Sequence, residues 1–148
     1  MDISSNGSYP ANKLSNFAGH RFMIDGIECY SMEGFIQGLK FRSADMQVEI
    51  CKLVGIGAKR AGANKDWKRL QTLYWRGHEI KRNSLEYQEL LDKAYTAMFE
   101  QSESFRNDLK ASKGSTLTHR LGKRKQSDTV LTTNEFISRL NKLRDKII

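Results

Sequence analysis

Apolar residues recur every three to four positions along much of this chain, a spacing typical of helices with one buried face. The longest such run follows Ser84, a residue type that often caps the start of a helix. Its buried face is predicted to carry Tyr87, Leu90, Leu91, Ala94 and Met98. A helix of this kind must pack against other elements, so the fold should be rich in helices.

Three shorter helices are expected to supply those packing faces. One covers about residues 44–54, and Phe105 and Leu109 indicate a second. The third should open at Thr132 and Glu135, whose spacing matches a capping box. The face of the first is predicted to carry Met46, Ile50, Leu53 and Val54. The face of the last is predicted to carry Phe136, Ile137, Leu140 and Leu143.

The segments between these helices contain residues that favour turns. Gly55, Gly57 and Gly62 are expected to end the preceding helix and form a loop. The segment DWKRLQTLYW, residues 66–75, is expected to form a further helix or a turn. Residues 112–128 are polar, basic and contain glycine, so they should form a loop or a short pair of strands.

A small amount of sheet is expected near the N-terminus. In RFMIDGIECY, residues 21–30, two short strand-like runs flank Asp25 and Gly26, a dipeptide that favours a tight hairpin turn. The chain has 148 residues, the length of one ordinary domain. We therefore predict a single α+β domain over residues 1–148, rich in helices and with a small hairpin or sheet.

The formal net charge of +8 indicates an anionic partner, either a phosphorylated ligand or a nucleic acid. The N-terminus lacks a signal-peptide pattern, and no apolar run approaches the roughly 20 residues of a membrane span. We expect a cytoplasmic protein with no membrane partner, in which Cys29 and Cys51 are reduced structural thiols. The three histidines (20, 78 and 119) lack the spacing of metal ligands, so no metal site and no cofactor are predicted.

The segment SMEGFIQGLKF, residues 31–41, places two helical rows side by side. Its apolar row consists of Met32, Phe35, Ile36 and Leu39. A polar row beside it consists of Glu33, Gln37 and Lys40. The polar row is either a solvent-exposed helix face or one wall of an active site.

Gly34 and Gly38 lie on the far side of the same predicted helix. Each glycine costs a helix about 1 kcal/mol relative to alanine. Their presence predicts that another backbone or a ligand approaches this side closely.

Several segments, in order and over nearly the whole chain, resemble the YbiA-like or NADAR family. The most specific are LSNF (14–17) and SMEGFIQGLKF (31–41), and weaker ones continue through YWRG (74–77) to the late LTHRLG and DTVLT segments. The resemblance implies an enzyme that breaks N-glycosidic bonds at a phosphorylated ribose. Its substrates would be ribosylamino-pyrimidine or -uracil phosphates of the early riboflavin pathway, or ADP-ribose attached to a nucleobase such as guanine.

The resemblance also implies the positions of the site residues. Glu33, Trp75 and Asp128 match the family's catalytic positions, and Trp75 suits the family's spacing better than Trp67. The family's histidine after the glutamate is Gly34 in this chain.

The late part of the family pattern is altered in this chain. The family's D-x-x-W-G segment is replaced by THRLGKRKQSD, residues 118–128. Either His119 or Asp128 could therefore protonate the leaving base. Asn16 and Phe17 match the family's S-N-F positions, where they would contact the substrate.

The residues themselves suit this chemistry. Glu33 could stabilise positive charge at the anomeric carbon or direct a water molecule to it. Lys40 could attack the opened sugar as an amine, or contact a phosphate. Gln37 could orient a ribose hydroxyl or Glu33. Trp75 would stack on a base and Asn16 would hydrogen-bond to it, although a tryptophan in this setting is equally often a core residue.

Three functions therefore remain open from the sequence. The first is an N-glycosidase acting on a small phosphoribosyl or ADP-ribosyl substrate, or on an ADP-ribosylated nucleic acid. The second is a module that binds ADP-ribose or NAD without cleaving it. The third, a general nucleic-acid-binding protein, rests on net charge alone and lacks a recognisable binding motif. The sequence leaves the oligomeric state open.

Overall fold

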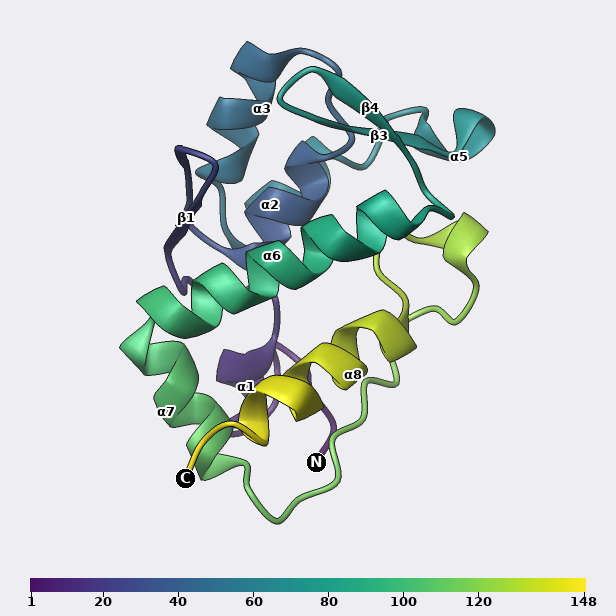
Figure 1. The fold of residues 1–148 in the computed structure, drawn as a ribbon. Helices are drawn as coiled ribbons and strands as arrows, with labels where there is room; N and C mark the ends of the chain where they lie inside the picture. The colour runs from purple at the N-terminus through teal and green to yellow at the C-terminus, as the bar shows by residue number, and fades with distance from the viewer.

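The computed structural model describes residues 1–148, and its central element is the long helix α6 (Leu85–Gln101). The Ser84 hydroxyl caps this helix by accepting a hydrogen bond of 3.1 Å from the Tyr87 amide. The predicted face is confirmed, since Tyr87, Leu90, Leu91, Ala94 and Met98 are all buried. Helices α2 (Met32–Gly38) and α8 (Thr133–Arg144) pack on different sides of α6 (Figure 1).

Two antiparallel hairpins complete the α+β fold, which has eight α-helices in all. The first joins β1 (Phe22–Ile24) to β2 (Ile27–Cys29), as predicted, and pairs Ile24 with Ile27. Both turn residues, Asp25 and Gly26, have positive φ angles of 51° and 79°. This backbone conformation matches the twist of the flanking strands.

The second hairpin was not predicted. It joins β3 (Thr72–Trp75) to β4 (His78–Lys81), and only α5 (Trp67–Leu70) of the preceding segment is helical. The expectation of a helix or turn throughout residues 66–75 was therefore wrong for β3. The β-branched and aromatic residues of TLYW favour a strand, and the Arg76–Gly77 turn repeats the positive φ angles of the first hairpin, at 54° and 83°.

The region after α2 also differs from the prediction. Helix α3 (Ala44–Cys51) forms, but Met46 and Val54 are about half exposed, while the buried positions are Gln47, Ile50 and Cys51. The expected glycine loop is instead helix α4 (Gly55–Ala61), which packs on α2. Ala58 is fully buried, so burial outweighs the low helix propensity of the glycines.

The C-terminal part follows the prediction closely. Helix α7 (Glu103–Ala111) buries Phe105 and Leu109. The chain then runs without regular structure to the short 3₁₀ helix η1 (Gln126–Asp128), and the predicted capping box opens α8. None of the helices is long and apolar enough to cross a membrane.

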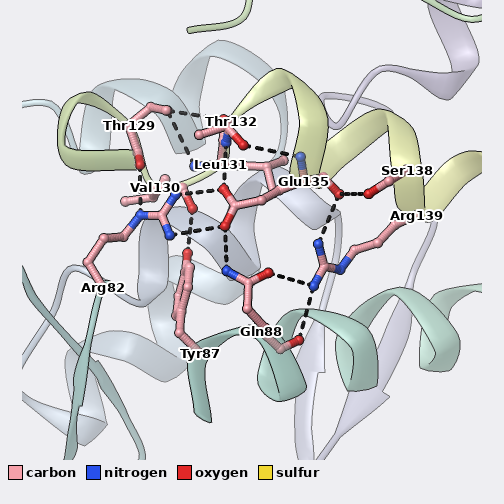
Figure 2. A network of polar contacts seen from close by, with 10 residues as sticks. All are labelled: Arg82, Tyr87, Gln88, Thr129, Val130, Leu131, Thr132, Glu135, Ser138 and Arg139. Carbon is pink, nitrogen blue, oxygen red and sulfur yellow. Dashed lines mark hydrogen bonds and ion pairs between the residues drawn. The ribbon is translucent and has the colours of Figure 1, made fainter. Parts of the chain in front are cut away.

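A buried polar network holds the segment before α8 in place (Figure 2). Arg82 is fully buried and donates two hydrogen bonds, of 2.6 and 3.1 Å, to the Glu135 carboxylate. Its Nε also donates to the Thr129 carbonyl at 2.9 Å, and the Tyr87 hydroxyl donates to the Val130 carbonyl at 2.5 Å. Residues 129–132 are thereby fixed to α6 and to the end of β4.

Candidate active site

A cavity of about 550 Å³ lies beside α2, bounded by the segment from α4 to α5 and by the late segment that precedes α8. The structure brings together seven of the eight predicted site residues in its wall: Asn16, Phe17, Glu33, Gln37, Lys40, His119 and Asp128. These residues lie up to 112 positions apart in the sequence, so the fold rather than local sequence gathers them. The eighth, Trp75, is elsewhere.

Helix α2 fixes the polar row at the cavity wall. Its start is capped by Ser31, whose hydroxyl accepts a hydrogen bond of 3.0 Å from the Gly34 amide. One turn apart, Gln37 Nε2 donates to Glu33 Oε2 at 3.0 Å. Lys40 Nζ donates to the Gly62 carbonyl at 3.4 Å, so the loop after α4 lies directly against the row.

Gly62 permits this close approach. A Cβ atom at this position would lie 1.9 Å from Gln37 Oε1 and 3.2 Å from the Lys40 side chain. Gln37 Oε1 is buried and accepts no hydrogen bond within the chain. The amide of Gln37 is therefore held between Glu33 and the loop, with one acceptor unused.

Burial sets the proton affinities of the two charged members of the row. It raises the pKa of Glu33 above its usual value, against the lowering effects of the Gln37 hydrogen bond and of the nearby Lys40 and Lys59 charges. Burial also lowers the pKa of Lys40, and the Lys68, Lys123 and Lys59 charges add to that effect, while Glu33 opposes it. Each group is thus closer to its neutral form than it would be on the surface.

The far side of α2 explains its two glycines. A Cβ at Gly34 would lie 2.5 Å from the Leu53 carbonyl oxygen, and one at Gly38 would lie 2.9 Å from Cys51 Sγ. The predicted close approach of another backbone is therefore confirmed. A histidine cannot occupy position 34 unless the Cys51–Leu53 segment moves.

Asn16 and His119 are both held by hydrogen bonds that leave one polar group available. The buried Tyr95 hydroxyl donates to Asn16 Oδ1 at 2.8 Å, so the Asn16 NH₂ group remains to donate to a ligand. His119 Nδ1 lies 2.8 Å from the Ile3 carbonyl oxygen, which can only accept, so Nδ1 carries a hydrogen. The ring packs edge-on against Phe136, and Nε2 remains for a ligand.

The two candidates for the late acid have different surroundings. His119 is partly buried in the cavity wall, and its loop is tied to α8 because Thr133 Oγ1 donates to the His119 carbonyl at 3.3 Å. Asp128 is exposed at the end of η1 and lines the rim of the cavity. Both can reach a ligand, but only the side chain of His119 forms a hydrogen bond within the protein.

Trp75 does not line the cavity, contrary to the sequence prediction. Its Nε1 donates to Asp25 Oδ2 at 2.8 Å, and its ring packs against Phe35 with centroids 5.1 Å apart. Successive side chains of a strand point to opposite faces, so Trp75 shares the core face of β3 with Leu73. Trp67, from α5, lines the cavity instead.

Sequence reasoning also missed most of the cationic groups of the site. Besides Lys40, the wall contains Lys59, Lys65, Lys68 and Lys123. Lys123 belongs to the basic run GKRK (122–125), and the other three lie in the basic stretch between the start of α4 and the end of α5. Such runs are common on solvated surfaces, so only the fold shows that these lysines converge.

Comparison with known proteins agrees with the fold described above. A family model for bacteriophage protein GP30.3 matches residues 8–145. The chain is 40% identical over 151 residues to an uncharacterized 17.1 kDa protein in the Gp30-rIII intergenic region of Enterobacteria phage T4, covering 99% of this chain and 98% of that protein.

A solved structure shows the same fold. The NMR structure of the E. coli protein YbiA matches with a TM-score of 0.63 and 21% sequence identity, covering 99% of this chain and 83% of YbiA. The predicted YbiA-like α+β fold is therefore confirmed. With the match over residues 8–145, this chain belongs to the bacteriophage protein GP30.3 family.

Proposed function

We propose that this protein is an N-glycosidase that hydrolyses the bond between a base and a phosphorylated ribose, in a phosphoribosyl or an ADP-ribosyl compound. The observation that carries the proposal is a partly buried carboxylate, Glu33, in a cavity lined by five lysines. Cleavage of an N-glycosidic bond builds positive charge on the sugar, while phosphates need cationic partners. The lining of the cavity offers both kinds of group.

Glu33 is assigned to the anomeric carbon. In its ionised form it stabilises the cation that develops there, or directs a water molecule to it. Gln37 Nε2 orients the carboxylate through its 3.0 Å hydrogen bond. The base leaves easily only when protonated, and His119 or Asp128 is assigned to that step.

Lys40 has two possible roles. As a cation it binds a phosphate together with the other lysines of the wall. As a neutral amine it displaces the base from C1 of the ring-opened sugar, which leaves a lysine imine that water then hydrolyses. The lowered pKa of Lys40, caused by burial and nearby lysines, favours the second role.

The test is a search for a freed base after incubation with two substrates, a ribosylamino-pyrimidine phosphate and an ADP-ribosylated guanine nucleotide. Glu33→Gln should reduce turnover roughly 100- to 1000-fold, because it removes the charge and keeps the shape. Glu79→Gln is the matched control, since Glu79 is exposed on β4, and it should be fully active. Failure of the folded wild-type protein to cleave either substrate would contradict the proposal.

One observation favours a second candidate, a module that binds ADP-ribose or NAD without cleaving it. Gly34 stands where the YbiA-like pattern has a histidine, and the Leu53 carbonyl fills that space. Tight binding measured by calorimetry, together with zero turnover, would select this function.

A further inference from the structure

Part of the cavity wall comes from the N-terminal segment, residues 1–5, of which Ser4 and Ser5 line the cavity. This segment meets the late segment that contains His119 in a parallel bridge. The two segments lie at opposite ends of the sequence, so the fold makes the position of His119 depend on the start of the chain.

The Asp2 carboxylate binds the residues on both sides of His119. Asp2 Oδ1 accepts a hydrogen bond of 2.9 Å from the Arg120 amide and another of 2.9 Å from Thr118 Oγ1. These two bonds hold the pKa of Asp2 below its usual value, so the carboxylate is ionised at neutral pH. The backbone adds a further bond of 2.8 Å, from the Ile3 amide to the Thr118 carbonyl. Both neighbours of His119 are therefore anchored to the N-terminal segment.

The imidazole ring of His119 is itself held in one orientation. Its Nδ1 lies 2.8 Å from the Ile3 carbonyl oxygen, and the ring packs edge-on against Phe136 with centroids 5.2 Å apart. A Cβ at Gly122 would lie 2.7 Å from His119 Cδ2, so the glycine leaves room for the ring on that side. Because a carbonyl oxygen only accepts hydrogen bonds, Nδ1 keeps its hydrogen, and Nε2 is the nitrogen that can gain or lose a proton.

We propose that Asp2 is a positioning residue, which keeps His119 in the tautomer with its hydrogen on Nδ1 and so leaves Nε2 to exchange a proton with a ligand. Neutral His119 takes up a proton at Nε2 and becomes an imidazolium, and it returns to the neutral form when that proton passes to the ligand. The hydrogen bond from Nδ1 to the Ile3 carbonyl is kept in both states. The use of the proton rests on the proposed function, in which the group that receives it is the leaving base.

The test is NMR of the histidine rings in the full-length ¹⁵N-labelled protein, which shows the ring nitrogen that carries the hydrogen. Neutral His119 of the wild-type protein should carry it on Nδ1. His20 is an internal reference of the opposite kind, because its Nε2 lies 2.7 Å from the Lys13 carbonyl oxygen and therefore carries a hydrogen. Asp2→Ala should convert His119 to a mixture of both tautomers and leave the His20 signals unchanged.

Enzyme kinetics give a second readout. Asp2→Ala should lower kcat roughly tenfold and leave KM nearly unchanged, because a misplaced imidazole loses part of the roughly 100-fold or more that a positioned acid or base contributes. Asp2→Asn keeps Oδ1 as an acceptor and should restore most of the wild-type tautomer and rate. Glu79→Ala removes an exposed carboxylate from β4 and should change neither.

The proposal is overturned if wild-type His119 carries its hydrogen on Nε2, or if Asp2→Ala leaves the His119 signals unchanged. Thr118→Val removes only one of the two bonds to Asp2 and should have a smaller effect than Asp2→Ala. A larger effect of Thr118→Val would take the positioning role away from Asp2. Because the ring signals need no turnover, a protein that shows them but cleaves nothing would keep the positioning role of Asp2 and lose only the N-glycosidase function.

Discussion

The molecule buries charged side chains in two places, and the two places differ in how many hydrogen-bond partners those side chains have. At the junction of β4, α6 and α8, Arg82 and Glu135 satisfy each other (Figure 2). Although burial alone would raise it, the pKa of Glu135 is held below its usual value by hydrogen bonds from Arg82, Gln88 and the Thr132 amide. In the cavity, Glu33 receives a side-chain hydrogen bond only from Gln37, and burial raises its pKa.

The number of hydrogen-bond partners distinguishes a buried charge that stabilises the fold from one that is available to a ligand. A fully paired buried ion resists any change of partner or proton, so it stabilises one conformation. A partly paired ion costs stability and remains available to a ligand. The surroundings of the two carboxylates supply different numbers of hydrogen-bond donors, and the substitutions below test whether the two carboxylates also differ in role.

The largest effect is expected for Arg82→Met. It leaves Glu135 buried without its main partner and releases the Thr129 carbonyl, so the free energy of unfolding should fall by about 3–5 kcal/mol. Urea unfolding measures this loss. As a control, Arg69→Met breaks the exposed ion pair with Asp66 and should cost less than about 1 kcal/mol. Equal losses of stability in the two variants would show that the buried pair contributes no more than the exposed one.

Lys40→Arg should lower turnover roughly 100-fold or more, as much as Lys40→Ala, with little loss of stability. An arginine keeps the positive charge but cannot act as a neutral amine at ordinary pH. Borohydride added during turnover should trap a sugar adduct on the wild-type protein, detectable by mass spectrometry. An active Lys40→Arg variant with no adduct would assign Lys40 to phosphate binding, and high salt should then weaken substrate binding.

The pH dependence of stability should have opposite signs at the two carboxylates. Burial raises the folded pKa of Glu33 above its unfolded value near 4.5, so its contribution to stability falls as the pH rises from 4.5 through the raised pKa. Glu33→Gln removes this cost, and its gain in stability over wild type should be larger at pH 7 than at pH 4. Unfolding in urea at both pH values measures the gain.

Glu135 shows the reverse behaviour. Its folded pKa is lowered, so its contribution is present above pH 4.5 and is lost as the pH falls through the lowered value. Glu135→Gln should therefore lose more stability at pH 7 than at pH 4. If both variants change in the same direction with pH, the two carboxylates do not differ as described.

The smallest effect is expected for Trp75→Phe, at about 1 kcal/mol of stability, from the lost hydrogen bond to Asp25. Turnover should not change, because Trp75 lies in the core. Trp67→Ala should weaken ligand binding and also lower stability, since Trp67 lines the cavity and belongs to the buried core. A loss of turnover in Trp75→Phe with normal stability would return Trp75 to the active site.

Local signals predicted most of the helices, because caps and apolar spacing act within a few residues. Three such signals are confirmed: the Ser84 cap of α6, the Thr132–Glu135 capping box of α8, and the Asp25–Gly26 hairpin turn. Helix α4 was missed because its stability depends on Ala58 packing against α2, which a glycine-rich segment does not reveal.

Helical spacing predicted the polar row at α2, and the family resemblance supplied the distant residues Asn16, Phe17, His119 and Asp128 of the cavity lining. Glu33 and Gln37 lie in α2 and Lys40 follows two residues after its end, so their helical spacing placed them together. The family's spacing favoured Trp75, but Trp75 lies outside the cavity lining because the direction of its side chain depends on its position along β3, which the spacing does not show. Lys65 and Lys123 reach one cavity only through the tertiary fold.

The tight contact behind Gly34 also limits how this chain can evolve. A mutation to histidine would place the new side chain against the Leu53 carbonyl, where even a Cβ would lie at 2.5 Å. The change would be tolerated only after the link between α3 and α4 had shifted. Loss or gain of a histidine at position 34 is thus an epistatic step, open to a lineage only after an earlier substitution elsewhere.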